Sequence, residues 1–311
     1  MAPAPQPQPL PQLLLESYLK QLRLPSFAEL YQQLAQDAAR TDLSYERFLL
    51  ALVQEEVARR ERNSVERAIR QAHFPVLKEL SDFEWSAVPD LSKPRVLELA
   101  QGGYISRAES VLLIGNPGLG KTHVASGLAL AACRQGKRVR FYNVAGLVNE
   151  LVVAQQEYRL SRFMAASLKQ HLIVLDELGF IPFTSGAAQL LFQFVSGLYE
   201  RVAVIVTTNL RFAEWSSVMG GDERMSAALL DRLTHRAHIL ELRGTSYRFR
   251  QQLQRGGAES PGPEPMAQEL RHLENSGTSL KEINSTGTGS EKASPGPGPE
   301  QEEEAEPKTD D

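Results

Sequence analysis

The residues GNPGLGKT at positions 115–122 constrain the fold of this chain more than any other segment. They follow an apolar run at 111–114 and fit the pattern G-x-x-x-x-G-K-[ST], which predicts a strand, a glycine-rich loop and a helix. In such a loop, successive N–H groups point at bound phosphates, and the helix N-terminus adds the positive end of its dipole. A glycine-rich turn that binds no ligand could have the same sequence, so the assignment as a phosphate loop depends on other segments of the chain.

The loop and the first residues after it are the candidate nucleotide-binding residues. Lys121 is expected to reach the β- and γ-phosphates of ATP, and the Thr122 hydroxyl is expected to bind the Mg²⁺ ion that bridges them. The full candidate set is Gly115, Asn116, Pro117, Gly118, Leu119, Gly120, Lys121, Thr122 and His123.

Apolar runs alternate with helical patterns in the central part of the chain. The runs are 111–114, 139–142, 172–176, 203–208 and 238–242. Continuous aliphatic runs of this kind predict parallel strands that are buried on both faces of a sheet. Right-handed crossovers between them predict a three-layer α/β sandwich, with the phosphate loop at the edge where open α/β sheets bind ligands.

The flanking segments differ in composition. Residues 13–75 show helical spacing of apolar side chains and predict a small all-helical domain, in which Ser26 and Glu29 form a capping box. The net charge of −4 is uneven, because residues 256–311 contain 13 acidic and 4 basic residues. The predicted boundaries are a disordered Pro/Gln-rich segment at 1–12, the helical domain at 13–75, a linker at 76–104, an ATPase domain at 105–255 and a disordered acidic tail at 256–311.

Cysteine usage and hydropathy bear on the compartment. Cys133 is the single cysteine, which excludes a disulfide framework and indicates a reducing environment. No secretory signal pattern is present at the N-terminus, and no uninterrupted apolar run approaches the roughly 18 residues that indicate a membrane span. We expect a cytoplasmic protein without a membrane partner.

Two further strand ends carry polar residues that suit nucleotide hydrolysis. Asp176 ends the run LIVLD and is expected to support the Mg²⁺ ion, while Glu177 is expected to polarise an attacking water. An acidic pair that caps a strand is the alternative. Asn209 follows the run AVIVTT and is expected to orient the lytic water; otherwise it caps the helix that follows.

Two arginines near the C-terminal end of this region are candidates for contacts with the nucleotide. Arg232 is expected to reach the γ-phosphate of a neighbouring subunit, a contact that can be worth about 10³–10⁵ in rate. An ion pair with Asp231 is the alternative for this arginine. Arg248 is expected to contact the nucleotide of its own subunit.

The segments GNPGLGKTH, LIVLDELGF, VTTNL, LLDRLTHRAHIL and GTSYR together resemble the AAA+ initiator and helicase-loader group. They most closely resemble the IstB-like ATP-binding proteins of bacterial insertion sequences, over residues 13–253. The resemblance implies a P-loop NTPase fold of the AAA+ type with a mostly parallel sheet and a reduced or absent lid domain. It also implies a DNA-dependent ATPase that uses ATP and Mg²⁺, forms homo-oligomers on duplex DNA, deforms that target DNA and assists a DDE transposase in transposition.

The resemblance also suggests where DNA lies. Helices inserted before the LIVLDE strand face DNA in this group, which implicates Arg159, Arg162 and Lys169. A second basic set lies in the N-terminal helical region: Arg59, Arg60, Arg62, Arg67 and Arg70. A solvated helix face is the alternative for each of these residues. As a set they predict salt-sensitive binding to the phosphate backbone without a base-reading motif.

Other functions compatible with a phosphate loop are a replicative helicase loader and a small-molecule kinase. The loader would share the ATPase core and differ in its partner. Glu177 beside Asp176 favours hydrolysis over a kinase reaction. A GTPase is disfavoured because the sequence contains no N-K-x-D motif, and an ABC ATPase is disfavoured because it contains no LSGGQ-like signature.

Overall fold

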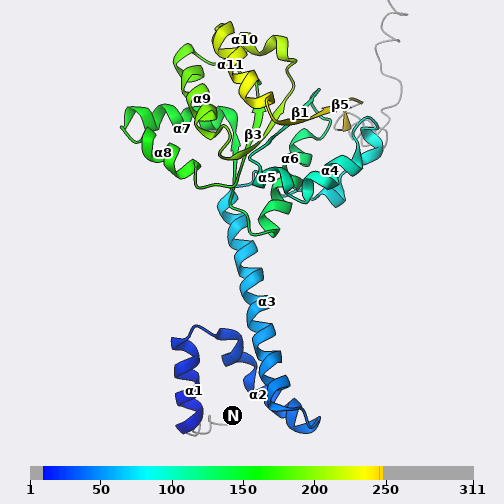
Figure 1. Cartoon of the computed structure of the whole chain (residues 1–311), viewed down its shortest axis with the longest axis vertical. Helices are drawn as coiled ribbons and strands as arrows, with labels where there is room; N and C mark the ends of the chain where they lie inside the picture. Colours follow the sequence, from blue (N-terminus) through cyan, green and yellow to red (C-terminus); the bar gives the residue numbers. More distant parts are fainter. Residues whose placement is uncertain (1–9, 245, 248–311) are drawn as a thin grey trace, which may run out of the picture. The chain divides into compact units, whose positions relative to one another are not determined.

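The computed structural model describes residues 10–244, 246 and 247, all within one compact unit, Met1–Gly257 (Figure 1). Arg248, the lid, the acidic tail and residues 1–9 of the predicted disordered segment lie outside the described residues, whereas residues 10–12 of that segment are helical, a correction to its predicted boundary. The α-helices are α1 (Leu10–Gln21), α2 (Pro25–Arg40), α3 (Tyr45–Ala72), α4 (Lys93–Ala100), α5 (Gly103–Ser106), α6 (Lys121–Arg134), α7 (Val144–Gln156), α8 (Leu160–Ser167), α9 (Ser185–Leu198), α10 (Trp215–Val218) and α11 (Glu223–Thr234). Short 3₁₀ turns are η1 (Leu80–Asp82), η2 (Trp85–Ala87) and η3 (Phe212–Glu214).

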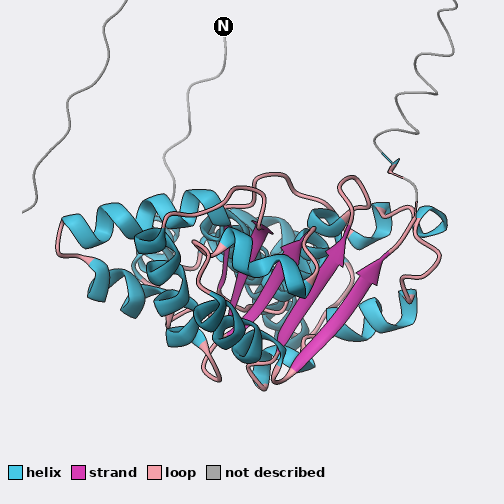
Figure 2. Ribbon diagram, turned by 90° about the horizontal axis from the view of Figure 1, so that it is seen from above, coloured by secondary structure: helices cyan, strands magenta, loops and turns pink. Residues whose placement is uncertain are grey.

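Five parallel strands form one sheet, and their arrows all point the same way in Figure 2. The strands are β1 (Ser110–Gly115), β2 (Val139–Asn143), β3 (Leu172–Leu178), β4 (Ala203–Thr208) and β5 (Ala237–Leu242). Their order is β2-β3-β4-β1-β5, so the chain crosses over between non-adjacent strands. The predicted α/β class, the parallel sheet and the five strand positions are confirmed.

Alternate side chains of each strand enter two separate apolar clusters, which explains the three layers. Val111 and Leu113 of β1 belong to one cluster, and Leu112 between them belongs to the other. Strand β3 divides in the same way, because successive side chains of a strand point to opposite faces. Both faces of the sheet are therefore covered, as its unbroken apolar runs predict.

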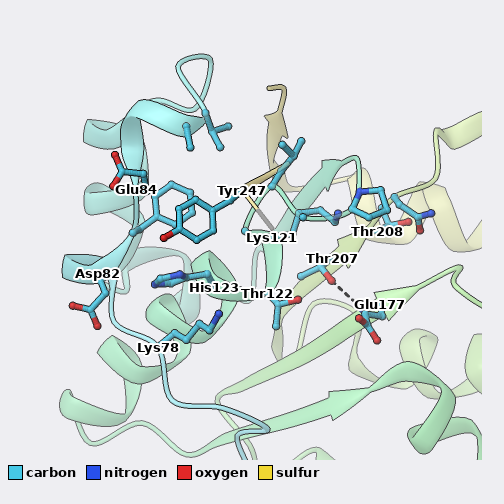
Figure 3. A pocket seen from close by; sticks show the side chains of 18 of the residues that line it. Lys78, Asp82, Glu84, Lys121, Thr122, His123, Glu177, Thr207, Thr208 and Tyr247 are labelled. Atoms are coloured by element: carbon cyan, nitrogen blue, oxygen red, sulfur yellow. Dashed lines mark hydrogen bonds between the residues drawn. The ribbon is translucent and has the colours of Figure 1, made fainter. Parts of the chain in front are cut away.

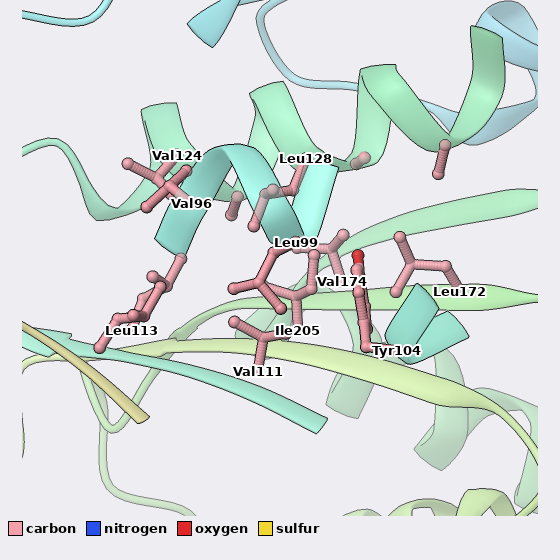
Figure 4. Packing of buried hydrophobic residues seen from close by; sticks show 14 of the residues in the cluster. Val96, Leu99, Tyr104, Val111, Leu113, Val124, Leu128, Leu172, Val174 and Ile205 are labelled. Carbon is pink, nitrogen blue, oxygen red and sulfur yellow. The ribbon is translucent and has the colours of Figure 1, made fainter. Parts of the chain in front are cut away.

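Helices α4 and α6 cover the first face of the sheet (Figure 4). Val96 and Leu99 of α4 pack with Val124 and Leu128 of α6 above Val111, and all five are at most 4% exposed. Burying a leucine or valine side chain fully is worth about 1.5–3 kcal/mol, so this layer holds α6 and the loop before it firmly against the strand ends.

Residues 76–104, predicted as a linker, contribute to the same core. Val88, Leu91 and Tyr104 are at most 5% exposed and lie in the cluster that contains Val111. This part of the chain therefore packs as an integral layer on the sheet.

The predicted capping box at Ser26 and Glu29 is wrong. Helix α2 begins at Pro25 after Leu24, and Ser26 lies inside its first turn, 3% exposed. The Ser26 main-chain N–H donates to Oε2 of Glu56 on α3 at 2.9 Å. A carboxylate from a neighbouring helix thus satisfies a helix N-terminus that sequence reasoning assigned to a local cap.

Glu109, just before β1, accepts two charge-assisted hydrogen bonds from Arg107. Nε and Nη2 of Arg107 donate at 2.7 and 2.8 Å, and Nε2 of His238 on β5 lies 2.9 Å from Oε2. The hydrogen bonds from Arg107, aided by His238, lower the pKa of Glu109 from 4.5 to about 2, against the opposing effect of burial. The carboxylate therefore links β5 to the segment that leads into β1.

Replacing Glu109 with glutamine is expected to lower the free energy of unfolding at pH 7 by about 1–2 kcal/mol. A folded-state pKa below the unfolded value contributes stability above pH 4.5 that is lost as the pH falls toward 2. The difference from wild type should therefore shrink as the pH falls below 4.5 in urea titrations. Glu98→Gln, at an exposed acid paired with Arg95, is the matched control and should change stability by less than about 0.5 kcal/mol. An equal effect of both variants would contradict the role of Glu109.

Candidate functional site

The loop after β1 has the backbone of a phosphate cradle. Gly118 and Gly120 adopt left-handed φ values of 84° and 88°, which side chains other than glycine rarely adopt. A Cβ at Gly120 would also lie 2.6 Å from the ring of Phe83. Helix α6 begins at Lys121, directly after this glycine, so its N-terminal N–H groups face the loop. The curled backbone that sequence analysis predicts is present.

Lys121 lies over its own loop. Its Nζ donates to the carbonyl oxygens of Gly115 at 2.6 Å and Asn116 at 2.9 Å. Both acceptors are main-chain groups of the cradle, so the ammonium is held where a phosphate in the loop would meet it.

Asp176, two residues before the end of β3, accepts hydrogen bonds from two hydroxyl groups of neighbouring elements. Thr122 Oγ1 donates to Oδ1 of Asp176 at 2.9 Å, and Thr207 Oγ1 of β4 donates to the same oxygen at 2.6 Å. Asp176 is 4% exposed, and this burial raises the pKa of its carboxyl above the usual value, while the two hydroxyl donors counteract the rise. A desolvated carboxylate beside a threonine hydroxyl is the oxygen donor set that Mg²⁺ prefers. The residues present therefore fit the ion.

Glu177 is the next residue, in a strained backbone conformation. Its φ is 62°, and the pairing of β3 with β4 is irregular between Leu175 and Leu178. The Glu177 N–H donates to Thr207 Oγ1 at 2.9 Å, the dashed line in Figure 3. A non-glycine residue at positive φ costs on the order of 1–3 kcal/mol and persists where the surroundings enforce it. The irregularity turns Glu177 out of the strand alternation and into the cavity.

Asn143 holds the Glu177 side chain, a contact that sequence analysis missed. Its Nδ2 donates to Glu177 Oε2 at 2.7 Å. Its Oδ1 caps α7 by accepting from the N–H groups of Ala145 and Gly146. The sequence contained a signal for this contact, because Asn143 directly follows an apolar run that predicts a strand. In the structure Asn143 ends β2 and lies in register with Asp176 on β3.

Lys121, Thr122, Glu177 and Thr207 line one cavity of about 380 Å³. Asp176 and Asn143 lie behind this lining and contact it through Thr122, Thr207 and Glu177. Figure 3 shows Lys121, Thr122, Thr207 and Glu177 on one side of this space and Tyr247 with Glu84 on another. The cavity lining includes Pro117–His123 and Asn209, but Gly115 and Asn116 contribute to the site through the carbonyls that hold Lys121. The alternative role of Asn209 as a helix cap is wrong, since Arg211 is the residue that precedes η3.

The opposite wall comes from residues 78–88, which we call the strap. Phe83, Ala87 and Val88 of the strap supply apolar surface to the cavity, and the Tyr247 N–H donates to Gly118 O at 3.1 Å. This wall was not predicted, although the aromatic residues at 83 and 85 were visible in the sequence. Flat apolar walls beside a phosphate cradle suit a nucleotide base.

The strap is fixed to α6 by several contacts. The ring of Phe83 lies 4.8 Å from that of Trp85 and 5.3 Å from that of His123, measured between centroids. His123 Nε2 lies 2.7 Å from the Glu79 carbonyl oxygen, and the Glu79 carboxylate pairs with Arg134 at 2.5 Å. His123 thus supports the wall as well as lining the cavity.

Arg232 lies away from this cavity. Its Nη1 donates to the Ala228 carbonyl at 2.8 Å, and its guanidinium carbon lies 4.8 Å from the centre of the Phe192 ring. It lines a separate small hollow of about 20 Å³ near the start of the sheet. Within the described residues it forms no ion pair with Asp231.

The candidate DNA-contacting residues divide into those that form an ion pair within the described residues and those that do not. Arg59 pairs with Glu29 at 2.6 Å, and Arg60 pairs with Glu56 and donates to the Arg23 carbonyl. Exposed members without an ion pair in the described part of the chain are Arg62, Arg67, Arg70, Arg162 and Lys169. Arg159 is exposed and pairs with Glu157.

No group of three or more His, Cys, Asp or Glu side chains among the described residues could hold a metal ion, so Mg²⁺ would depend on Thr122, Asp176 and the phosphates themselves. No helix within residues 10–247 that the structure describes is long and apolar enough to cross a membrane.

Comparison with known proteins gives a consistent result. The family model described as "IstB-like ATP binding protein" matches residues 17–255. The insertion-sequence IS5376 protein of Geobacillus stearothermophilus, named for ATP binding, is 33% identical over 76% of this chain and 94% of its own length. The corresponding IS21 protein of Pseudomonas aeruginosa is 34% identical over 78% of this chain and 91% of its own.

Two solved structures are more distant. The DnaC helicase loader is 19% identical, covers 48% of this chain and 87% of its own, and has a TM-score of 0.42. AMPPCP-bound DnaA from Aquifex aeolicus is 18% identical, with coverages of 61% and 59% and a TM-score of 0.47. At this distance neither structure indicates a function for this chain.

Proposed function

Since this chain belongs to the family of IstB-like ATP-binding proteins, we propose that it is a Mg²⁺-dependent ATPase that oligomerises on duplex DNA and assists a DDE transposase. The observation that most supports hydrolysis is the group formed by Thr122, Asp176 and Glu177. The hydroxyl groups of Thr122 and Thr207 hold Asp176 Oδ1 at 2.9 and 2.6 Å, and Glu177, one residue later, lines the same cavity as these two threonines.

Each residue has a distinct role in the proposed reaction. The loop N–H groups and Lys121 bind the phosphates, and Thr122 with Asp176 would hold Mg²⁺, which when bound neutralises charge on the β- and γ-phosphates. Glu177 accepts a proton from the attacking water, and Asn209 orients that water. Asn143, which donates to Glu177 Oε2 at 2.7 Å, positions this carboxylate.

The proposed function is tested by ATP turnover with and without a random-sequence duplex, followed by light scattering of the ATP-bound protein. We expect the duplex to raise turnover several-fold and ATP to shift the protein from monomer to oligomer. A monomer whose turnover ignores DNA would favour the kinase class. Capture of purified DDE transposase, with a ring helicase as the comparison, separates the helper from the loader.

Arg232→Ala is expected to reduce turnover by about 10³-fold, because we propose that this guanidinium completes the site of a neighbouring subunit. It lines a hollow outside the cavity of its own subunit. Mixing the inactive Arg232→Ala and Lys121→Ala proteins should restore part of the activity, since some sites would combine an intact Lys121 with an intact Arg232. Arg236→Ala, at an exposed neighbour, is the control and should leave turnover unchanged. A mixture as inactive as its components would contradict action between subunits.

A further inference from the structure

Tyr158, in the turn between α7 and α8, is 97% exposed and has a φ of 55°. Both properties are unusual for a tyrosine. A large aromatic side chain without packing partners contributes nothing to the core, and a left-handed backbone disfavours a residue with a Cβ atom. Glycine or asparagine would satisfy this turn with less strain. The folding of the chain therefore gives no reason for a tyrosine at this position.

The turn that carries Tyr158 is firmly anchored. The Arg159 N–H donates to the Ala154 carbonyl at 2.7 Å, and the Tyr158 N–H donates to the Gln155 carbonyl at 3.1 Å. Leu151 and Ala154 of α7 are at most 5% exposed, and Phe163 of α8 packs against the same apolar cluster. The two helices, which lie next to each other in Figure 1, thus present the ring on a fixed backbone.

The segment of the sequence that carries this ring is basic. Residues 137–171 contain six Lys and Arg residues and two acids, Glu150 and Glu157, a net charge of +4. Glu157 neutralises Arg159, with which it pairs, while Arg162 and Lys169 are exposed near the two ends of α8. Nε of Arg138 donates to the Lys169 carbonyl at 2.6 Å, which adds a third cation at the far end of this helix.

An exposed aromatic ring on a segment that also carries exposed cations matches the chemistry of a nucleic acid, whose phosphates attract the cations and whose base pairs accept a ring between them. We propose that Tyr158 is a wedge that enters the base stack of duplex DNA and bends it, while Arg162 and Lys169 hold the flanking phosphates. This inference rests on the proposed binding of duplex DNA and goes beyond it, because it names the residue that deforms the duplex. Side chains inserted between base steps kink DNA by roughly 20–90°.

In this arrangement, DNA bending should depend on Tyr158, whereas the salt dependence of DNA binding should depend on the cations. Tyr158 carries no charge, so its loss should leave the salt dependence of binding unchanged. Loss of Arg162 should reduce the slope of log K against log salt by about one phosphate contact. A surface that binds DNA by charge alone would lack this separation, which makes the bend angle the decisive measurement.

The experiment compares full-length wild type with Tyr158→Ala on a 30-base-pair duplex that carries a donor and an acceptor fluorophore at its ends. A second duplex contains 2-aminopurine at its centre, and both are used with ATP. Wild type should raise energy transfer and 2-aminopurine emission, which report bending and unstacking. Tyr158→Ala should lose most of both signals with less than about a tenfold loss in affinity. Tyr158→Trp should retain them, because a ring is still present.

Tyr45→Ala is the matched control, since Tyr45 is 90% exposed at the start of α3. It should bend DNA like wild type. Equal bending by wild type and Tyr158→Ala, or binding by wild type without bending, would overturn the wedge and leave the proposed DNA-dependent ATPase in place. Failure of wild type to bind DNA would overturn both. Loss of ATP-driven assembly in Tyr158→Ala without DNA would assign the ring to a contact between subunits instead.

Discussion

Lys121→Ala is expected to weaken the binding of a fluorescent ATP analogue at least about 100-fold, which corresponds to ~3 kcal/mol. The reason is the position of its ammonium, which lies 2.6 and 2.9 Å from two carbonyl oxygens of the phosphate loop. Charge-assisted hydrogen bonds from this group to phosphate oxygens are about twice as strong as neutral ones, and alanine removes them all. Fluorescence titration in the presence of Mg²⁺ measures the loss, and turnover should disappear with it.

The matched control for this prediction is Lys20→Ala, at an exposed lysine of α1 far along the chain from the loop. It removes the same charge and should leave nucleotide binding unchanged. Circular dichroism and thermal unfolding should be similar for both variants. Nucleotide binding of wild-type strength by a folded Lys121→Ala protein would remove the basis of the phosphate-loop assignment.

Glu177→Gln is expected to keep nucleotide binding within about threefold of wild type and to slow hydrolysis by about 10²–10⁴-fold, the range typical of a lost general base. Glutamine preserves the shape of the side chain and an oxygen that can accept from Asn143 Nδ2, now 2.7 Å from the carboxylate. It does not accept a proton from water. Phosphate release measures the rate, and titration with ATP measures the affinity.

Glu200→Gln is the matched control for this second variant, because Glu200 is also an acid with a left-handed backbone, at φ 57°. It lines the small hollow outside the nucleotide cavity and should hydrolyse ATP at the wild-type rate. Normal hydrolysis by Glu177→Gln would mean that another group activates the water. Loss of affinity together with rate would instead give Glu177 a role in binding.

The central sheet and the phosphate loop could be predicted because their signals are local. Residues 111–114 are apolar and the glycines follow directly, so strand, loop and helix are encoded within a dozen residues. The position of Asp176 in β3 was predicted in the same way, from the apolar run that it ends. Parallel strands then bring their carboxyl ends to one edge whatever the details of packing.

Other parts of the site depend on contacts between distant residues. The strap wall arises because Phe83 packs against His123 and Gly120, forty residues later, and no local pattern signals that pairing. The N-terminus of α2 fails as a capping box for the same reason, since Glu56 reaches Ser26 from another helix.

The helical spacing of apolar residues in the N-terminal region predicted helices but not the burial of each side chain. On α3, Leu52 is 3% exposed, whereas Leu49 and Val57 are 54% and 49% exposed. The spacing of apolar residues identifies a helix face correctly but does not reveal whether another element covers it.

The strap has a consequence for engineering the chain. It lines the nucleotide cavity and continues into Leu91, Val96 and Leu99, which pack in the core beneath α6. A fragment that starts at residue 105 would lack one side of its own binding site and leave apolar surface of the sheet layer uncovered. Chimeras that exchange the N-terminal helices between relatives should therefore keep residues 74–104 with the sheet that they cover.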